Sequence, residues 1–348
     1  MKKKIISVLL ATAMVASLVV GCGNSSESAK TDDTVKTEEK TENAADDTVE
    51  KDDAAKDTAE VSSDGDTYKI AWVDGNLANE SNSVCTAAAK AYAESITDSK
   101  IEFTLLDGEG SGEKQVDQTE TLIAQGVDCI MMQPYDAAAC QVGVQACIDA
   151  GVKVLVVKAP IEDQSICPFI GQDDIVAGQM EMDWVADQLG EKGNIVILEG
   201  PTGNSAALNR NDGITKALES YADINVLYTQ TGNWNRDEGM SLMENWLQTG
   251  EQIDAVVAHN DEMALGAYDA IADAGKVGEI KVIGIDAIDA AKESVSAGEM
   301  DATILQDVEG IAKKAVDVAV MLCKGEEVED TYYIDPVLLT KDNIADYM

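Results

Sequence analysis

The sequence is poor in histidine and in basic residues. It has 348 residues, of which one is histidine (His259), and its 25 Lys and Arg stand against 65 Asp and Glu, a net charge of −40 at pH 7. A single histidine argues against a histidine-based metal site and against a Ser-His-Asp triad. The acidity argues against a nucleic-acid partner, because phosphates are bound by clustered Lys and Arg. It also argues against a polybasic helix lying on a membrane.

Long apolar runs are missing except at the N-terminus. Three lysines (residues 2–4) precede an apolar stretch over 5–20, which is too short for a comfortable membrane span and typical of an export signal. The stretch ends in VVGC at Cys22, which resembles the lipobox of bacterial lipoproteins. We expect cleavage before Cys22 and lipidation of its sulfur, which would anchor the chain to the outer face of the cytoplasmic membrane. The alternative is an ordinary signal peptide with an incidental cysteine.

Residues 23–65 lack aromatic residues and have hardly any large apolar ones. They hold 14 acidic residues and 5 lysines among Ser, Thr, Ala and Gly. Such a segment cannot bury enough surface to offset the entropy of ordering it, so we predict a disordered acidic tether. An acidic interaction tail is the alternative.

The remaining segment, 66–348, alternates strand and helix signals, and apolar residues make up 45% of the whole chain, enough for a core. Short apolar runs occur at 68–73, 101–106, 129–132, 152–157, 195–198, 224–228, 255–257 and 280–285. Amphipathic helical patterns follow most of them, at 83–96, 114–125, 137–150, 205–220, 236–248, 262–274 and 287–297. Such units build parallel sheets, so we predict an α/β fold of two doubly wound, Rossmann-like domains.

Ligands of parallel sheets bind at the carboxyl ends of the strands, so the residues just after each predicted strand are the candidates for a site. These residues are Asn79, Asn82, Gln133, Lys158, Asp173, Asp174, Arg210, Trp234, Asn260, Asp286 and Gln306. The set is rich in amides and carboxylates, has two cations and one aromatic ring, and contains no nucleophile-plus-base pair. Amides and carboxylates hydrogen-bond hydroxyls, and an aromatic face covers the C–H side of a sugar ring, so the set suits an uncharged polyol.

Five segments carry a family resemblance. They are 259–267 (HNDEMALGA), 282–286 (VIGID), 301–306 (DATILQ), 204–210 (NSAALNR) and 122–128 (LIAQGVD). On these motifs the chain resembles the type I periplasmic binding proteins, in the ribose/galactose-type branch of sugar receptors of ABC transporters. The resemblance spreads over nearly all of 66–348. It implies two lobes joined by a three-strand hinge.

The resemblance also assigns roles to five of the candidates. Arg210, Asn260, Asp286 and Gln306 would hydrogen-bond sugar hydroxyls, and Trp234 would stack on the ring. Without the motifs, Asp286 could equally be a helix cap, Asn260 a turn residue and Trp234 a core aromatic.

The first lobe departs from the family pattern. Where ribose receptors carry an aromatic pair, this chain has NESN at 79–82, and where they carry Asp-Arg it has Lys158-Ala159. Asp174 replaces a family Asn. These changes make ribose itself doubtful and leave open a different sugar, a cyclitol or a ligand with an anionic group. Tyr135 is a candidate for the missing aromatic surface, whereas Trp72 fits the core better.

The resemblance implies a layout and a function. One lobe would comprise 66–172 plus 307–335, and the other 173–306 plus 336–348. We expect a monomeric, lipid-anchored binding protein without cofactor or catalysis, which captures a monosaccharide or related polyol and delivers it to an ABC permease with its ATPase. The alternative is a sugar sensor for a membrane signalling receptor. The remaining alternative is a sugar-cleaving enzyme, which would need two carboxylates on either side of the bond that is cleaved. Asp286 and Asp174 are the candidates for such a pair.

Six cysteines follow Cys22, and no metal-ligand spacing occurs among them. Cys140 and Cys147 lie two turns apart on one predicted helix, about 10 Å along its axis and beyond disulfide reach. We expect mostly free, buried thiols, with one disulfide pair left open.

Overall fold

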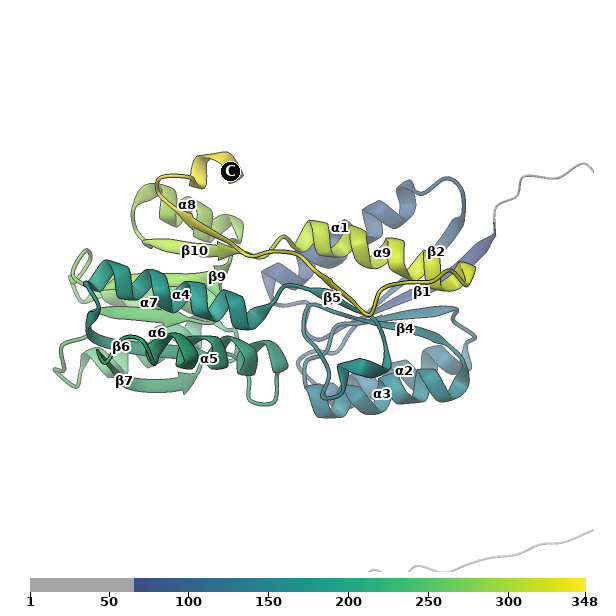
Figure 1. The fold of residues 1–348 in the computed structure, drawn as a ribbon, viewed down its shortest axis with the longest axis horizontal. Helices are drawn as coiled ribbons and strands as arrows, with labels where there is room; N and C mark the ends of the chain where they lie inside the picture. Colours follow the sequence, from purple (N-terminus) through teal and green to yellow (C-terminus); the bar gives the residue numbers. More distant parts are fainter. Residues whose placement is uncertain (1–65) are drawn as a thin grey trace, which may run out of the picture. The chain divides into compact units, whose positions relative to one another are not determined.

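The computed structural model of the protein describes residues 66–348, so the predicted leader, Cys22 and the tether lie outside the described residues. The described chain forms two six-stranded sheets, each covered by helices on both faces (Figure 1). This confirms the predicted fold class of two α/β lobes built on parallel sheets. Within 66–348, no helix has the length and apolar character needed to cross a membrane.

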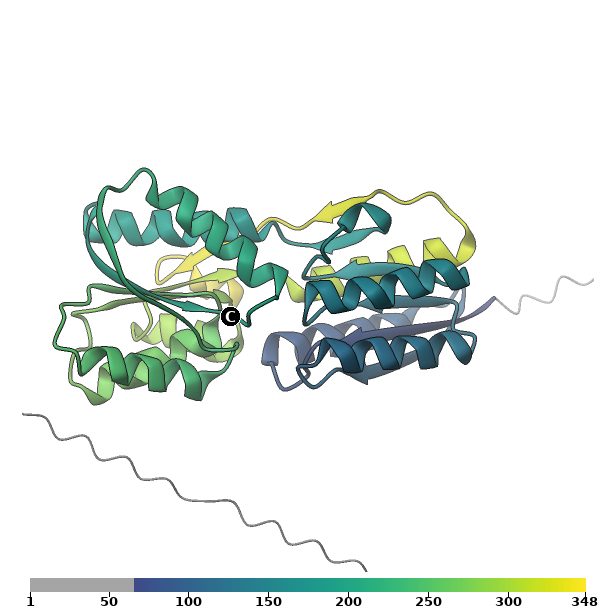
Figure 2. The same ribbon diagram turned by 90° about the horizontal axis from the view of Figure 1, so that it is seen from below.

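We call the first sheet and its helices lobe 1. The strand order is β2-β1-β3-β4-β5-β11, and all neighbours are parallel. The strands are β1 (Thr67–Asp74), β2 (Lys100–Asp107), β3 (Cys129–Met132), β4 (Lys153–Val157), β5 (Phe169–Gly171) and β11 (Thr331–Tyr333). The helices are α1 (Glu80–Ser95), α2 (Gly112–Ala124), α3 (Ala137–Ala150) and α9 (Val308–Lys324), with a 3-10 turn at Gln164–Ile166. Helices α1 and α9 lie on one face, and α2 and α3 on the other (Figure 2).

We call the second sheet and its helices lobe 2. The strand order is β7-β6-β8-β9-β10-β12, and only β12 runs antiparallel to its neighbour. The strands are β6 (Lys192–Glu199), β7 (Asp223–Thr231), β8 (Ala255–Ala258), β9 (Lys281–Asp286), β10 (Ala302–Leu305) and β12 (Val337–Thr340). The helices are α4 (Asp174–Leu189), α5 (Ser205–Leu218), α6 (Arg236–Leu247), α7 (Asp261–Asp273) and α8 (Asp289–Ala297), followed by a 3-10 turn at Ile344–Tyr347.

The central strands are apolar on both sides because helices cover both faces of each sheet. Along β3, Cys129 and Met131 join the cluster under α1 and α9, whereas Ile130 and Met132 join the cluster under α2 and α3. All four residues are fully buried. This explains why the strand segments appear in the sequence as continuous apolar runs and not as alternating ones.

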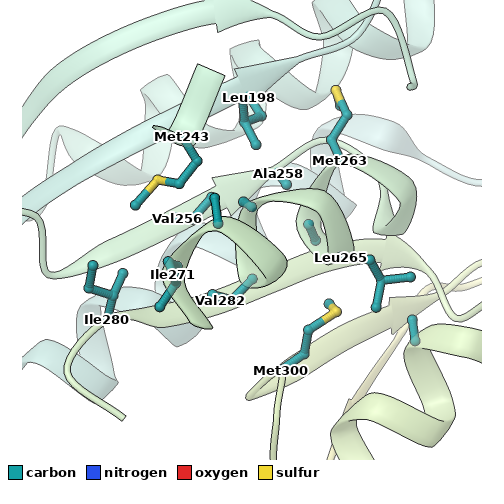
Figure 3. Close-up of a cluster of buried hydrophobic side chains, with 14 of the residues drawn as sticks. Leu198, Met243, Val256, Ala258, Met263, Leu265, Ile271, Ile280, Val282 and Met300 are labelled. Atoms are coloured by element: carbon teal, nitrogen blue, oxygen red, sulfur yellow. The ribbon is translucent and has the colours of Figure 1, made fainter. Parts of the chain in front are cut away.

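Lobe 2 repeats this arrangement. Leu198, Val256 and Val282 project from three neighbouring strands toward Met243 of α6 and Met263 of α7 (Figure 3). The flexible methionine side chains fill irregular gaps between helix and sheet. This packing fixes the strand ends from which the loops of the candidate site emerge.

The chain passes between the lobes three times. It leaves lobe 1 between β5 and α4, returns between β10 and α9, and leaves again between β11 and β12 (Figure 1). Each lobe is therefore built from separate stretches of the sequence.

Candidate functional site

A cavity of about 240 Å³ lies at the carboxyl ends of the parallel strands of both sheets. Nine of the eleven candidate residues line it: Asn79, Asn82, Gln133, Lys158, Arg210, Trp234, Asn260, Asp286 and Gln306. The other two do not line this cavity: Asp173 caps α4, and Asp174 is paired with Arg210. The topology thus brings together residues that are up to 227 positions apart, between Asn79 and Gln306.

Arg210 is held in place by buried partners. It lies on α5 with only 4% of its surface exposed, and its Nε donates to Asp174 Oδ1 at 2.9 Å. One Nη donates to the carbonyl of His259, and the guanidinium lies 5.5 Å from the centre of the Trp234 ring. Burial raises the pKa of Asp174, and the charge of Arg210 opposes that rise. The pair orients the guanidinium toward the cavity.

Trp234 lines the cavity just before α6. Its φ is +61° and that of Asn233 is +52°, so two successive non-glycine residues adopt the left-handed conformation. Such backbone costs on the order of 1–3 kcal/mol per residue and is retained chiefly at functional sites. A side-chain carbon at Gly200 would collide with the Trp234 ring, so the glycine makes room for it. The ring is tilted by 42° against His259 at 6.5 Å between centroids.

Asp286 ends β9 and points its carboxylate to the cavity without capping a helix. The N-cap of α8 is Ile288, which makes no side-chain cap bond. Asp286 has a φ of +130° and is 8% exposed. Burial raises its pKa, while Lys158 and Arg210 oppose the rise.

The loop after Asp286 is fixed by a buried carboxylate. Asp261, the first residue of α7, accepts from Ile288 N at 3.0 Å and from Thr303 Oγ1 at 2.7 Å. Thr303 Oγ1 in turn accepts from Ala287 N at 3.2 Å. Burial, reinforced by Asp286, raises the pKa of Asp261 to about 8.

Lobe 1 contributes a network of amides around one lysine. Lys158 Nζ donates to Ser81 Oγ at 2.8 Å and to Asn82 Oδ1 at 3.0 Å. Asn82 Nδ2 donates to Asp74 Oδ1 at 3.2 Å and to the carbonyl of Asn76 at 3.0 Å. Burial raises the pKa of Asp74 to about 6. The cation in lobe 1 is thus surrounded by oxygen acceptors of its own lobe.

Two glutamine side chains each carry an amide oxygen that accepts no hydrogen bond within the protein. Gln133 follows β3 and Gln306 follows β10, both are nearly buried, and both line the cavity. The Oε1 atom of each is buried without a hydrogen-bond partner. Buried amide oxygens are normally satisfied, so these two atoms point to a missing donor such as a hydroxyl.

The lobes contact each other beside the cavity through Asn204, at the start of α5, whose side chain was not among the predicted site residues. Asn204 caps α5 through its Oδ1, and its Nδ2 donates across the lobes to the carbonyl of Tyr135 at 3.0 Å. Ala137 N donates to the carbonyl of Gly203 at 3.1 Å. Further lining residues that were not predicted are Asn76, Asn233, Asn235, Arg236, Asp237 and Glu262. The cluster of Asn residues beside Trp234 was a visible signal for some of them.

Neither His259 nor Asp174 lines the cavity. Burial, reinforced by Arg210, lowers the pKa of His259 to about 3, so its imidazole is neutral and fully buried. Asp174 is paired with Arg210 and does not line the cavity, where the carboxylates are those of Asp237, Glu262 and Asp286. No group of three or more His, Cys, Asp or Glu within 66–348 could hold a metal ion.

Comparisons with known proteins point the same way. Residues 76–327 match the family model described as "Periplasmic binding protein domain". A xylitol-binding protein of Mycolicibacterium smegmatis is 42% identical over 232 residues, which is 66% of this chain and 66% of that protein. The ribose import binding protein of Bacillus subtilis is 34% identical over 231 residues, 66% of this chain and 74% of that protein.

Solved structures show the same fold. An ABC transporter solute-binding protein of Bacillus halodurans with bound myo-inositol has 35% identity and a TM-score of 0.78, covering 82% of this chain and 98% of that one. One from Actinobacillus succinogenes with bound D-allose has 29% identity and a TM-score of 0.75, covering 80% and 100%. The chain belongs to the type I periplasmic binding proteins, in the branch that contains the ribose-binding proteins.

Proposed function

We propose that the protein captures one uncharged sugar or polyol between its two lobes and delivers it to an ABC importer, without chemistry on the ligand. The observation that carries this proposal is the pair of unsatisfied oxygens on Gln133 and Gln306, one from each lobe, lining one cavity. Around them stand Arg210, Asp286 and Trp234, a set suited to hydroxyl groups on one side and C–H groups on the other.

The charges around the cavity favour a ligand without net charge. Arg210 is paired with Asp174, and Arg236 is paired with Glu262 at 2.8 Å. Lys158 donates to two neutral acceptors of lobe 1, and its charge opposes the burial-driven rise in the pKa of Asp286. An anionic ligand would therefore have to compete with the carboxylates paired with the two arginines and with the carboxyl group of Asp286. This supports a sugar, cyclitol or alditol over a sugar acid.

The relatives narrow the size of the ligand. Xylitol, ribose, myo-inositol and D-allose, the ligands named for the similar proteins, have five or six carbons and no charge. The cavity of about 240 Å³ is of a size for one such molecule. We propose a ligand of this class, bound singly.

Capture is proposed to work by closure about the three connections between the lobes. We place the boundaries at 172/173, 306/307 and 335/336, as the sequence predicts. A ligand that bonds Gln133 on one lobe and Gln306 on the other favours the closed arrangement, because only that arrangement satisfies both. Three connections permit bending and restrict free rotation.

We base the proposed location and partners of the protein on its N-terminal sequence and its family. The export signal and Cys22 support a lipid anchor at the outer face of the cytoplasmic membrane, with the segment 23–65 as tether. The partner is an ABC permease with its ATPase, and the protein acts as a monomer. The sensor alternative is not favoured, because the relatives are transport proteins such as a ribose import binding protein.

A thermal-shift screen tests the proposal. The panel contains xylitol, myo-inositol, ribose and allose, with glucuronate and glucosamine as charged counterparts. We expect a saturable rise in melting temperature with at least one neutral compound. The shift should be lost in Asp286→Asn and kept in the control Lys313→Ala, which alters an exposed ion pair on α9. A response to the charged compounds alone would overturn the proposed ligand class.

A further inference from the structure

A second cavity, of about 470 Å³, lies at the connections between the lobes, and we call it the hinge cavity. No residue lines both this cavity and the first one. Its walls come from both lobes: Pro160 and Tyr333 belong to lobe 1, Gln172 follows β5 at the first connection, and Ile175 and Asn209 belong to helices of lobe 2. The hinge cavity is therefore a separate hollow shared by the two lobes.

Two buried oxygens of the residues that line the hinge cavity accept no hydrogen bond. They are Gln172 Oε1 and Asp174 Oδ2, and each of these residues is 2% exposed. The other oxygen of Asp174, Oδ1, accepts from Gln172 Nε2 at 3.3 Å and from Arg210 Nε at 2.9 Å. Buried oxygens are normally satisfied, so this pair indicates a ligand that donates hydrogen bonds.

The charge of the hinge cavity is negative. Asp173, Asp174 and Asp330 line it, and none of the lining residues within 66–348 is Lys, Arg or His. Burial raises the pKa of the Tyr333 hydroxyl, and the negative charges of Asp173 and Asp174 reinforce the rise. A cation in the cavity would be stabilised by these carboxylates.

The N-terminus of α4 does not turn the hinge cavity into an anion site. Asp173 Oδ1 already accepts from Ile175 N at 3.0 Å and from Val176 N at 3.2 Å. Backbone N–H groups that are capped in this way are not free to bind an anion. The helix end therefore leaves the preference for a cation in place.

Two aromatic rings make part of the wall apolar. Phe169 is buried and Tyr333 is 59% exposed, and their ring centroids lie 6.0 Å apart at an angle of 70°. Aromatic rings attract organic cations and pack against their carbon atoms. Within 66–348, no group of three or more His, Cys, Asp or Glu could hold a metal ion. The wall thus favours an organic cation over an inorganic one.

We propose that the hinge cavity binds a small organic cation that carries a primary ammonium group on an apolar stem. The N–H groups donate to Gln172 Oε1 and Asp174 Oδ2, and the stem packs against Phe169 and Tyr333. A quaternary ammonium lacks the donors, and an alcohol lacks the charge. This binding site is additional to the site proposed for the polyol and does not depend on it.

The two cavities are expected to be coupled. Both are lined by both lobes, so a ligand in either one favours the same arrangement of the lobes. Each ligand should therefore strengthen the binding of the other, by the same factor of about five. This coupling rests on the proposed function, whereas the ammonium site itself does not.

An NMR titration of the full chain with n-butylammonium chloride tests the site without any polyol. Tetramethylammonium and 1-butanol are the counterparts that lack the N–H donors and the charge. We expect saturable shifts of backbone amide signals that are concentrated at 169–175 and 330–333, with one ligand per chain. The two counterparts should give no saturable shift there. This readout separates the site from general attraction of cations to an acidic protein, which is spread over the surface and screened by salt.

Variants at the wall give the control. Asp330→Asn removes a charge at an exposed residue, and Tyr333→Ala removes an exposed ring, so both should fold. Each should weaken butylammonium binding about fivefold. The matched control Asp335→Asn, at an exposed aspartate that does not line the hinge cavity, should leave it unchanged.

The coupling is measured by titration calorimetry with the polyol that gives the largest thermal shift, with and without saturating butylammonium. A polyol Kd that butylammonium leaves unchanged would overturn the coupling. If no polyol of the panel binds, the proposed function fails, and the titration without polyol still decides the ammonium site.

Three results would overturn the ammonium site. The first is a set of small shifts scattered over acidic residues that do not saturate. The second is equal binding of tetramethylammonium, because the unsatisfied oxygens would then play no part. The third is displacement of butylammonium by the polyol, which would place both ligands in the first cavity.

Discussion

At the scale of single residues, the buried pair of Arg210 and Asp174 is the most constrained feature of the site. Both side chains are at most 5% exposed, and the guanidinium also bonds the carbonyl of His259. Taking two charges out of water is expensive, so such a pair contributes little net stability but becomes costly when one partner is removed. Its value lies in the fixed direction of the guanidinium toward the ligand.

The variant Asp174→Asn tests this role. It removes the ion-pair partner of the buried Arg210, so we expect the free energy of unfolding to fall by about 3 kcal/mol. Ligand affinity should fall as well, because the guanidinium loses its orientation. Denaturant unfolding and calorimetry measure the two effects. The matched variant Glu262→Gln breaks the rim pair with Arg236, whose side chain is 39% exposed, and should cost under about 1 kcal/mol. Equal decreases in the free energy of unfolding for Asp174→Asn and Glu262→Gln would contradict this role of the buried pair.

The Trp234 ring depends on the missing side chain at Gly200. The change Gly200→Ala places a methyl group against the ring, which must turn away, so we expect about a tenfold loss of affinity from lost contact with the ligand. Trp234→Ala should give a loss of similar size. Because both changes act through one ring, the double variant should bind no more weakly than Trp234→Ala alone. Additive losses in titration calorimetry would show that Gly200 acts in another way.

At the scale of elements, the start of α7 holds the end of β9 through Asp261. The carboxyl group accepts from Ile288 N and Thr303 Oγ1, and burial raises its pKa to about 8. Asp74 at the end of β1 behaves similarly, with a pKa raised to about 6. Two elements that position the site are thus tied to carboxyl groups that bind protons more tightly in the folded state.

These groups predict that the folded protein loses stability as the pH rises. A carboxyl group with a raised folded-state pKa binds more protons folded than unfolded between its two pKa values. The stabilisation that such a group adds to the folded state is complete below about pH 4. It decreases as the pH rises and is gone by about pH 8 for Asp261, with a slope of at most about 1.4 kcal/mol per pH unit for each group. Glu181, whose pKa burial also raises, acts in the same direction.

Unfolding experiments from pH 5 to pH 8 measure this slope. In Asp261→Asn the decline between pH 6.5 and pH 8 should be smaller, because the asparagine does not titrate. The control Asp301→Asn changes a carboxylate that is paired with Lys281 and partly exposed, and it should leave the slope unchanged. An unaltered slope in Asp261→Asn would contradict the proposed protonation of Asp261.

The elements also show how far the sequence could be interpreted. Apolar runs predicted most strands and helices; the helical pattern over 262–274, for example, corresponds to α7, which the structure shows to be capped by Asn260 through a bond from Met263 N. The residue patterns predicted no helix over Asp174–Leu189, where the buried polar residue Glu181 interrupts the apolar face. The start of α8 was placed two residues early because Ala287 has a left-handed φ, which propensity does not reveal.

The candidate site was predictable where residues directly follow strands. Gln133, Lys158 and Asp286 stand at strand ends, and the topology makes such positions neighbours. Asp174 was predicted to bind the ligand directly, whereas the packing of α4 on α5 places it against Arg210 and outside the lining of the cavity, which no local pattern shows. Asn204 was missed because its role comes from a contact with the other lobe, which no local pattern encodes.

At the scale of the whole molecule, the site is shared between two lobes that the chain links three times. The unsatisfied oxygens of Gln133 and Gln306 belong to different lobes, so a ligand that satisfies both must lie between them. The two arginines beside the cavity are paired with carboxylates and Lys158 donates to neutral acceptors of its own lobe, which leaves hydrogen bonding and stacking to select the ligand. We therefore expect the affinity for an uncharged ligand to be independent of ionic strength, because salt screens interactions between charges.

Titration calorimetry with the neutral compound that gives the largest thermal shift, at low and at high salt, tests this claim most directly. The account predicts one ligand per chain and the same Kd at both salt concentrations. A Kd that weakens strongly with salt, or tighter binding of glucuronate or glucosamine than of any neutral polyol, would contradict it.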